Sequence, residues 1–124
     1  MKFNDDRPIF EQIAQLLEDR ILSGSFTESG RLPSARELAS ALEVNPNTAA
    51  RALQYLADMK LAYAERGSGY FVAPGAAEHI RNLRRERFFT EELPRVFGIM
   101  RSLEIQFDEL LPRWEAFMHR RIEP

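Results

Sequence analysis

The chain has 124 residues, of which 44% are hydrophobic and 29% charged, a composition typical of one folded domain or of a small domain with an appendage. It contains no cysteine, no apolar run of about 18 residues and no secretory signal at its start, which argues against disulfides, membrane spans and export and favours a cytoplasmic protein. The net charge is −2, and residues 1–74 alone carry −2 (8 basic minus 10 acidic side chains), so any nucleic-acid binding must depend on the local arrangement of charges.

A first helix is predicted over residues 8–23, where apolar side chains recur at helical spacing. Asp6 is the expected N-cap, Pro8 would lie in the first helical turn, and Gly24 stands where a glycine commonly ends a helix. A loop rich in Ser, Thr and Gly follows through residue 30.

Two shorter helices are predicted next, over residues 35–42 and 46–59. Ser34 and Glu37 form a capping-box pattern before the first of them, and Asn45 followed by Pro46 is a strong start for the second. The short turn between the two helices makes the pair typical of a helix-turn-helix.

A β-hairpin is predicted directly after these helices. Residues 61–65 and 70–72 are apolar and aromatic segments, and a turn containing Gly67 and Gly69 joins them. A hairpin in this position is typical of a wing. Residues 1–74 are therefore predicted to form a winged helix-turn-helix domain.

Residues 75–124 are predicted to form a helical tail. One apolar stripe runs from Ile80 to Leu103, and a last helix is expected over residues 107–120. Pro94 should kink or interrupt the first stretch because it removes an interior hydrogen bond, and Pro112 falls inside the last helix. The predicted fold is mainly α with a small β-hairpin, a winged helix-turn-helix followed by a two-helix dimerisation tail.

These motifs, in this order and at this spacing, resemble the GntR family of bacterial regulators over residues 8–73 and its short YtrA-like branch over nearly the whole chain. The matching segments are Pro8-Ile9-Phe10 with Gln12-Ile13, Leu32-Pro33-Ser34 with Arg36 and Leu38-Ala39, Val44 to Thr48, Arg51-Ala52-Leu53 with Leu56, and Gly67 to Val72.

The resemblance implies a winged helix that binds a double-stranded DNA operator, a homodimer and a short two-helix dimerisation tail. Residues 75–124 are too few for the sensing or aminotransferase-like domains of other branches. The family usually has glycine where Lys60 stands, so the turn there is expected to differ. Many members carry a basic residue at the position of Ala50, and here the cation is Arg51 instead.

The first residues of the third predicted helix should reach base edges in the major groove. Asn47 is favoured as the reader because a side-chain amide can donate to adenine and accept from it at once. In the rival interpretation Asn47 contacts only backbone, and Thr48 or Arg51 reads the bases. For Asn45, capping alone is an equal alternative. Arg36 is expected to contact phosphate rather than to pair with a neighbouring glutamate.

The predicted wing tip has two compatible interpretations. Arg66 can enter the minor groove, and the glycines can serve a turn that needs positive φ. The complete predicted DNA-binding set is Ser34, Arg36, Asn45, Asn47, Thr48, Arg51, Arg66, Gly67, Ser68 and Gly69.

The apolar stripe of the tail would form an unusually large exposed patch on a monomer, so a homodimer held by the tail is predicted. The aromatic residues of the last helix are interpreted as dimer core rather than as a ligand pocket. Any small-molecule effector should bind weakly, at the dimer interface or between tail and winged helix. The predicted dimerisation residues are Phe89, Leu93, Val96, Phe97, Met100, Leu110, Trp114, Phe117 and Met118.

The sequence gives little support for a metal site, a cofactor site or catalysis. His79 and His119 lack metal-ligand spacing, and no nucleophile-elbow motif, phosphate loop or nucleophile paired with a base is found, so no metal, cofactor or enzymatic activity is expected. We predict a DNA-binding transcription regulator, a repressor acting as a homodimer on an inverted-repeat operator. The alternative, which the acidic balance favours, is a winged-helix protein-interaction module without DNA binding.

Overall fold

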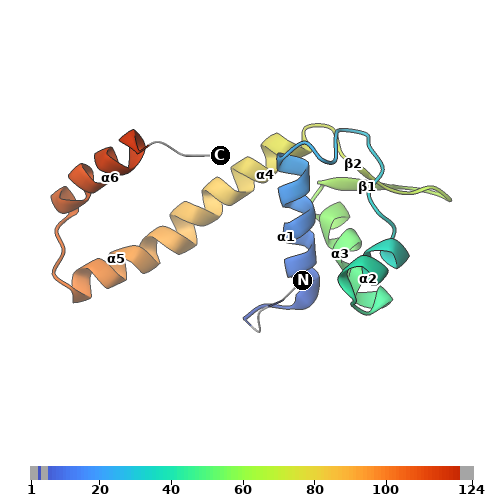
Figure 1. Cartoon of the computed structure of the whole chain (residues 1–124), viewed down its shortest axis with the longest axis horizontal. Helices are drawn as coiled ribbons and strands as arrows, with labels where there is room; N and C mark the ends of the chain where they lie inside the picture. Colours follow the sequence, from blue (N-terminus) through green and yellow to red (C-terminus); the bar gives the residue numbers. More distant parts are fainter. Residues whose placement is uncertain (1–2, 4–5, 121–124) are drawn as a thin grey trace. The chain divides into compact units, whose positions relative to one another are not determined.

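The computed structural model describes residue 3 and residues 6–120, and it divides into two compact units, one up to Leu83 and one from Arg84 onward. Among the described residues, the first unit contains three helices, a two-stranded hairpin and most of a fourth helix (Figure 1). This is the predicted mainly α winged helix-turn-helix fold with further helices after it.

The three helices of the first unit are α1 (Ile9–Leu22), α2 (Ala35–Leu42) and α3 (Pro46–Asp58). The predicted limits of α2 are confirmed, α1 is one residue shorter than predicted at each end, and α3 is one residue shorter at its C-terminal end. Both α1 and α2 pack against α3, as the helix-turn-helix interpretation requires.

The helices meet the hairpin in one apolar core. Each buried leucine or isoleucine in it stabilises the unit by about 1.5–3 kcal/mol relative to an exposed side chain. The core comprises Ile13, Ala14, Leu17, Ile21, Leu32, Leu38, Ala39, Ala49, Ala52, Leu53, Leu56, Leu61, Ala62, Val72, Ala76 and Ile80.

The hairpin pairs β1 (Ala62–Glu65) with β2 (Gly69–Val72) in antiparallel register. The loop before α2 extends this sheet, because the Leu32 N–H donates to the Tyr70 carbonyl at 2.8 Å and the Val72 N–H donates to the Gly30 carbonyl at 2.9 Å. The wing is thereby attached to the segment that leads into α2.

Two helix ends differ from expectation. Pro8, rather than Asp6, occupies the N-cap position of α1, because its ψ of 142° is not helical and its carbonyl already accepts from the N–H groups of the first turn. After α3, Lys60 adopts φ 66°, so the left-handed turn is kept and the expectation that it would differ is wrong. Gly24 has φ 89° after α1, as predicted.

Helix α4 (Ala76–Arg87) crosses the boundary between the two units. Its first turns belong to the first unit because Ala76 and Ile80 are buried in the core. The compact unit therefore extends beyond residue 74. The functional division into residues 1–74 and 75–124 stays a prediction.

In the second unit, a π-helical turn (Phe88–Glu92) leads into α5 (Leu93–Ser102), and a 3₁₀ turn (Phe107–Glu109) leads into α6 (Leu110–His119). The interruption predicted at Pro94 takes the form of the π turn, in which the Leu93 N–H reaches back to the carbonyl of Phe88. Pro112 lies in the first turn of α6, where no hydrogen bond is lost. No helix in the described part of the chain has the length and apolarity to cross a membrane.

Candidate nucleic-acid interface

The start of α3 is built by its cap. The Asn45 Oδ1 atom accepts from the Asn47 N–H at 2.7 Å, and the Asn45 carbonyl accepts from the N–H groups of Thr48 and Ala49. Pro46 follows at the first helical position, with φ fixed by its ring. The side-chain oxygen of Asn45 therefore caps the helix, and within the described part of the chain no hydrogen bond uses its exposed amide nitrogen.

Asn47 lies on the outward face of α3, opposite the buried side chains of the helix. It is exposed, and among the described residues no hydrogen bond engages its side-chain amide. Thr48, one residue further on, is half-buried. Of these two residues in the first turn of α3, Asn47 is therefore the one whose side chain is exposed to solvent.

The side chain of Arg51, on the same helix, contacts α1. Its guanidinium carbon lies 4.1 Å from the centre of the Phe10 ring, which in turn packs edge-on against Tyr55 at 5.7 Å. A cation held over a ring face in this way can still donate hydrogen bonds through those N–H groups that point away from the ring. The ring therefore restrains Arg51 without preventing a polar contact.

Two turns beyond Asn47, Gln54 connects α3 with the wing. The Tyr70 hydroxyl donates to Gln54 Oε1 at 3.0 Å, and Gln54 Nε2 donates to Asp58 Oδ1 at 2.9 Å. This connection was not predicted, because no local sequence pattern pairs a helix residue with a strand residue 16 positions away.

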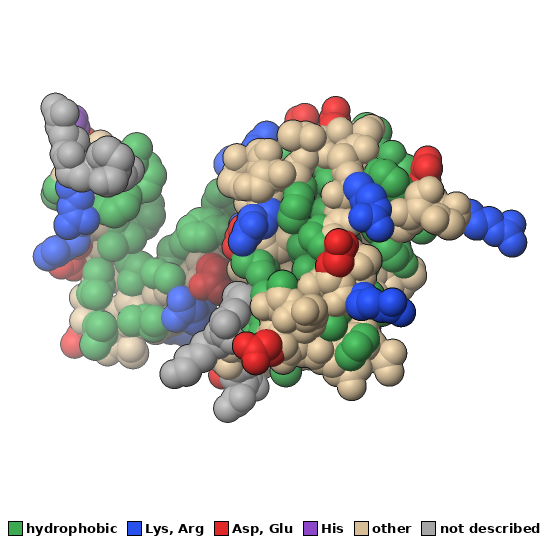
Figure 2. All heavy atoms as spheres, turned by 45° about the vertical axis from the view of Figure 1, so that its right-hand side comes forward, with side chains coloured by type: hydrophobic (Ala, Val, Ile, Leu, Met, Phe, Trp, Pro, Cys, Tyr) green, Lys and Arg blue, Asp and Glu red, His purple; other side chains and the backbone are tan. Residues whose placement is uncertain are grey.

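The wing tip is a tight connection from Glu65 to Gly69 with exposed Arg66, Gly67 and Ser68. Gly67 has φ 80° and Gly69 has φ 109°, so the predicted requirement for positive φ is met. Basic side chains are spread singly over the face drawn in Figure 2, with no large basic patch there.

Arg31 is a second connecting residue that lies outside the predicted DNA-binding set. Its Nε donates to the Ser68 carbonyl in the wing at 3.0 Å, and its guanidinium lies 3.9 Å from Glu37 Oε1 at the start of α2. The partners are 37 and 6 positions away in the chain, which is why periodicity and capping patterns do not reveal them. Arg31 thus connects the wing with the helix-turn-helix.

The start of α2 has the predicted capping box. Ser34 Oγ accepts from the Glu37 N–H at 3.0 Å, and Glu37 Oε1 accepts from the Ser34 N–H at 2.8 Å. The hydrogen bond that the Ser34 N–H donates to the Glu37 carboxylate, with smaller contributions from the Ser34 side chain and from Arg31, lowers the pKa of Glu37. Arg36 is exposed, and among the described residues no carboxylate pairs with it, so the predicted rival ion pair is not formed.

The tail carries the second predicted surface. Met100 is buried, while Leu93, Val96 and Leu110 are half-buried, and their role in dimerisation stays a prediction. Five of the exposed large apolar residues of the tail lie outside the predicted dimerisation set. The exposed set in the tail is Phe88, Phe89, Phe97, Ile99, Leu103, Phe107, Leu111, Trp114, Phe117 and Met118.

Comparison with known proteins gives a consistent result. Residues 9–72 match the family described as bacterial regulatory proteins, gntR family. A crystal structure of a transcriptional regulator of the GntR family from Bacteroides thetaiotaomicron is 39% identical, with a TM-score of 0.79 over 90% of this chain and 97% of that one.

Two relatives from Bacillus subtilis differ in how much of the chain they match. The HTH-type transcriptional regulator YhcF is 29% identical over 94% of both chains. The HTH-type transcriptional repressor YtrA is 36% identical over 56% of this chain and 53% of its own length.

Proposed function

The chain belongs to the gntR family of bacterial regulatory proteins, and we propose that it is a repressor that binds an inverted-repeat operator as a homodimer. It is a DNA-binding transcription regulator, and this family is not one of enzymes. The repressor role is supported by its likeness to YtrA, whose name describes that function.

The observation that carries the DNA-binding proposal is the outward face of α3 beside the wing. Helices of this kind place their first residues in the major groove, where side chains reach base edges. Asn47 is exposed there, and no described residue forms a hydrogen bond with its side-chain amide. We assign base reading to Asn47, with Thr48 and Arg51 beside it and Asn45 holding the helix start.

The remaining contacts position the protein on the duplex. Arg36 and Ser34, at the exposed start of α2, are assigned to phosphates, because contacts of that kind fix register without reading sequence. Arg66 is assigned to the minor groove, with Gly67, Ser68 and Gly69 allowing a close approach of the backbone.

The homodimer is supported by the apolar surface of the tail. Trp114, Phe117 and Met118 are each more than half exposed on α6, and Phe107 is 76% exposed. Contiguous apolar patches of this kind are rare on monomers and mark interfaces. A two-fold dimer presents two winged helices in inverted orientation, which is the reason for proposing an inverted repeat.

The DNA contacts are tested by selecting bound sequences from randomised half-sites with wild type, Arg36→Ala and Asn47→Ala. We expect Asn47→Ala to lose about 1–3 kcal/mol on the operator and to relax preference at one position per half-site. Arg36→Ala should weaken binding to every sequence alike. If Asn47→Ala keeps the wild-type base preferences, Asn47 is not the reader. If Arg36→Ala changes them, the division of roles is wrong.

The assembly is tested by sedimentation of the full chain at tens of micromolar, where a dimer is expected. Trp114→Glu should shift the equilibrium toward monomer and reduce operator affinity, because it places a charge in the apolar interface. Arg113→Glu, an adjacent change at an exposed position, serves as the matched control. A monomeric wild type would contradict the homodimer.

A further inference from the structure

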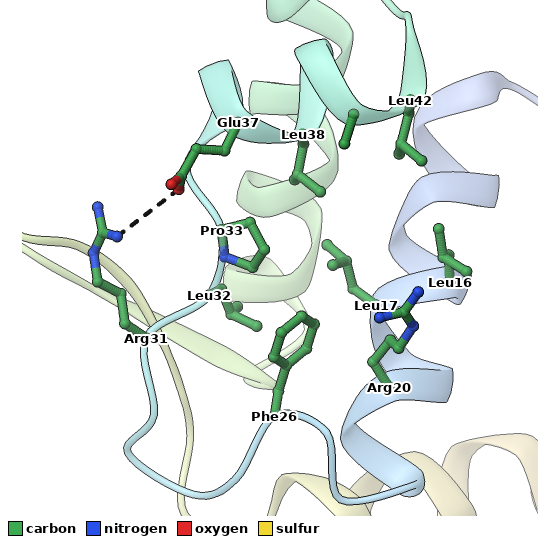
Figure 3. Close-up of a pocket in the computed structure, with 11 residues that line it drawn as sticks. Leu16, Leu17, Arg20, Phe26, Arg31, Leu32, Pro33, Glu37, Leu38 and Leu42 are labelled. Carbon is green, nitrogen blue, oxygen red and sulfur yellow. Dashed lines mark ion pairs between the residues drawn. The ribbon is translucent and has the colours of Figure 1, made fainter. Parts of the chain in front are cut away.

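A cavity of about 440 Å³ opens on the winged helix between α1, α2 and the loop that joins them (Figure 3). Its volume lies within the range of sites that hold small molecules. The walls are mainly apolar, and they are formed by Leu16, Leu17, Phe26, Leu32, Leu38 and Leu42.

Charged groups stand on opposite sides of this cavity. Arg20 approaches from α1, and Arg31 and Glu37 lie on the other side, joined as an ion pair (Figure 3). Glu37 is already engaged by the Ser34 N–H as well as by Arg31. No hydrogen bond or ion pair within the described part of the chain uses the Arg20 guanidinium.

We infer that this cavity is a binding site for a small carboxylate with an apolar body. The apolar walls suit the body, and two guanidinium groups against one carboxylate leave one positive charge to complement a monoanion. Guanidinium groups bind carboxylates through paired, charge-assisted hydrogen bonds. The site lies inside the winged-helix unit, unlike the effector sites predicted at the dimer interface or between tail and winged helix.

The position of Arg31 couples this site to the wing. Its Nε donates to the Ser68 carbonyl, so a carboxylate that draws the guanidinium into the cavity removes a hydrogen bond from the wing tip. Ligand binding should therefore weaken DNA binding. This second step rests on the proposed function, whereas binding to the cavity does not.

Binding is tested with the full-length chain and 4-phenylbutyrate as the probe, with its uncharged amide 4-phenylbutanamide as the control ligand. We expect saturable NMR shifts of the leucine methyl groups that line the cavity and of the Arg20 Nε–H, in roughly the millimolar range usual for a ligand of this size. The carboxylate should bind at least about tenfold more tightly than the amide.

Three variants locate the probe. Arg20→Gln should weaken the carboxylate about tenfold, and Arg113→Gln, the same exchange in the tail, should have no effect. Ala41→Phe places a ring at the cavity wall and should abolish binding without changing any charge. Shifts confined to the tail, equal binding of acid and amide, or undiminished binding to Ala41→Phe would each overturn the site.

The coupling is tested by fluorescence anisotropy on the selected operator. Saturating 4-phenylbutyrate should weaken operator binding at least about threefold in wild type and leave Ala41→Phe unaffected. Unchanged DNA affinity with the cavity occupied overturns the coupling but not the site. A chain that binds the probe and no DNA overturns the proposed function alone, and one that binds DNA but no probe overturns this inference alone.

Discussion

Replacing Lys60 by glycine should stabilise the winged helix. Lys60 is exposed and follows the C-cap of α3, with φ 66° in the left-handed region. Its N–H donates to the Ala57 carbonyl and the next N–H, that of Leu61, donates to the Leu56 carbonyl, which is the Schellman arrangement. The turn directs Leu61, which is buried, into the core, so the backbone cannot relax to avoid the left-handed conformation.

The expected change in folding free energy for Lys60→Gly is the difference between two opposing contributions. The left-handed conformation costs an L-residue about 1–2 kcal/mol, and glycine avoids this cost. Glycine loses about 0.5–1 kcal/mol more conformational entropy on folding. The net gain is about 0.5–1 kcal/mol, and for a unit of this size we expect Tm to rise by roughly 2–8 °C.

The assay is urea and thermal unfolding of the full chain at one fixed protomer concentration, because a dimer's apparent stability depends on concentration. Lys60→Ala is the matched control, since it removes the same charge but keeps Cβ. The glycine variant should be more stable than the alanine variant by the full 0.5–1 kcal/mol, at an unchanged denaturant dependence. If the two variants are equally stable, the backbone conformation of residue 60 does not limit stability and the reasoning is refuted.

Two further predictions concern charge. Glu37→Gln should lower Tm at neutral pH, because the ionised carboxylate of Glu37 stabilises the start of α2. The difference in Tm from wild type should disappear as the pH falls below 4.5 and through the lowered pKa of Glu37 in the folded state, because protonation removes that contribution. A difference that widens in acid would contradict this. The logarithm of operator affinity should fall against the logarithm of salt concentration with a slope of about −5, since the side chains of Arg36, Arg51 and Arg66 bring six positive charges per dimer to the duplex, each releasing about 0.9 counterion whether it lies against a phosphate or in a groove. A slope steeper than about −9 would show a basic surface beyond these residues.

The parts of the fold that are predictable from sequence are those with local causes. The limits of α2 follow from the capping box of Ser34 and Glu37, and the start of α3 follows from Asn45 and Pro46, since each device acts within three residues. The hairpin follows from two glycines that need positive φ. The start of α1 was predicted one residue too early, because Pro8 was placed inside the helix. Its observed ψ is not helical, so it lies at the N-cap position instead.

Other features depend on residues that are distant in the chain. The π turn before Pro94 is one of several ways in which a helix can accommodate a proline, and sequence alone does not choose between them. The contacts of Arg31 with Ser68 and of Gln54 with Tyr70 exist only because the hairpin folds back beside the helices. Arg31 was not predicted as part of the interface, because a single arginine in a loop belongs to no periodic pattern or motif.

Three side-chain amides on or next to α3, those of Asn45, Asn47 and Gln54, differ in whether their hydrogen-bonding atoms are available to a base. Bidentate binding to adenine needs an amide whose oxygen and nitrogen are both available. Asn45 has its oxygen engaged by the cap, and Gln54 has its oxygen engaged by Tyr70 and its nitrogen by Asp58. Asn47 alone of these three has both atoms unengaged by described residues, while its backbone N–H is held by Asn45. The cap therefore orients the residue that we propose as the reader, and replacing Asn45 should disturb base preference through Asn47 rather than by a lost contact of its own.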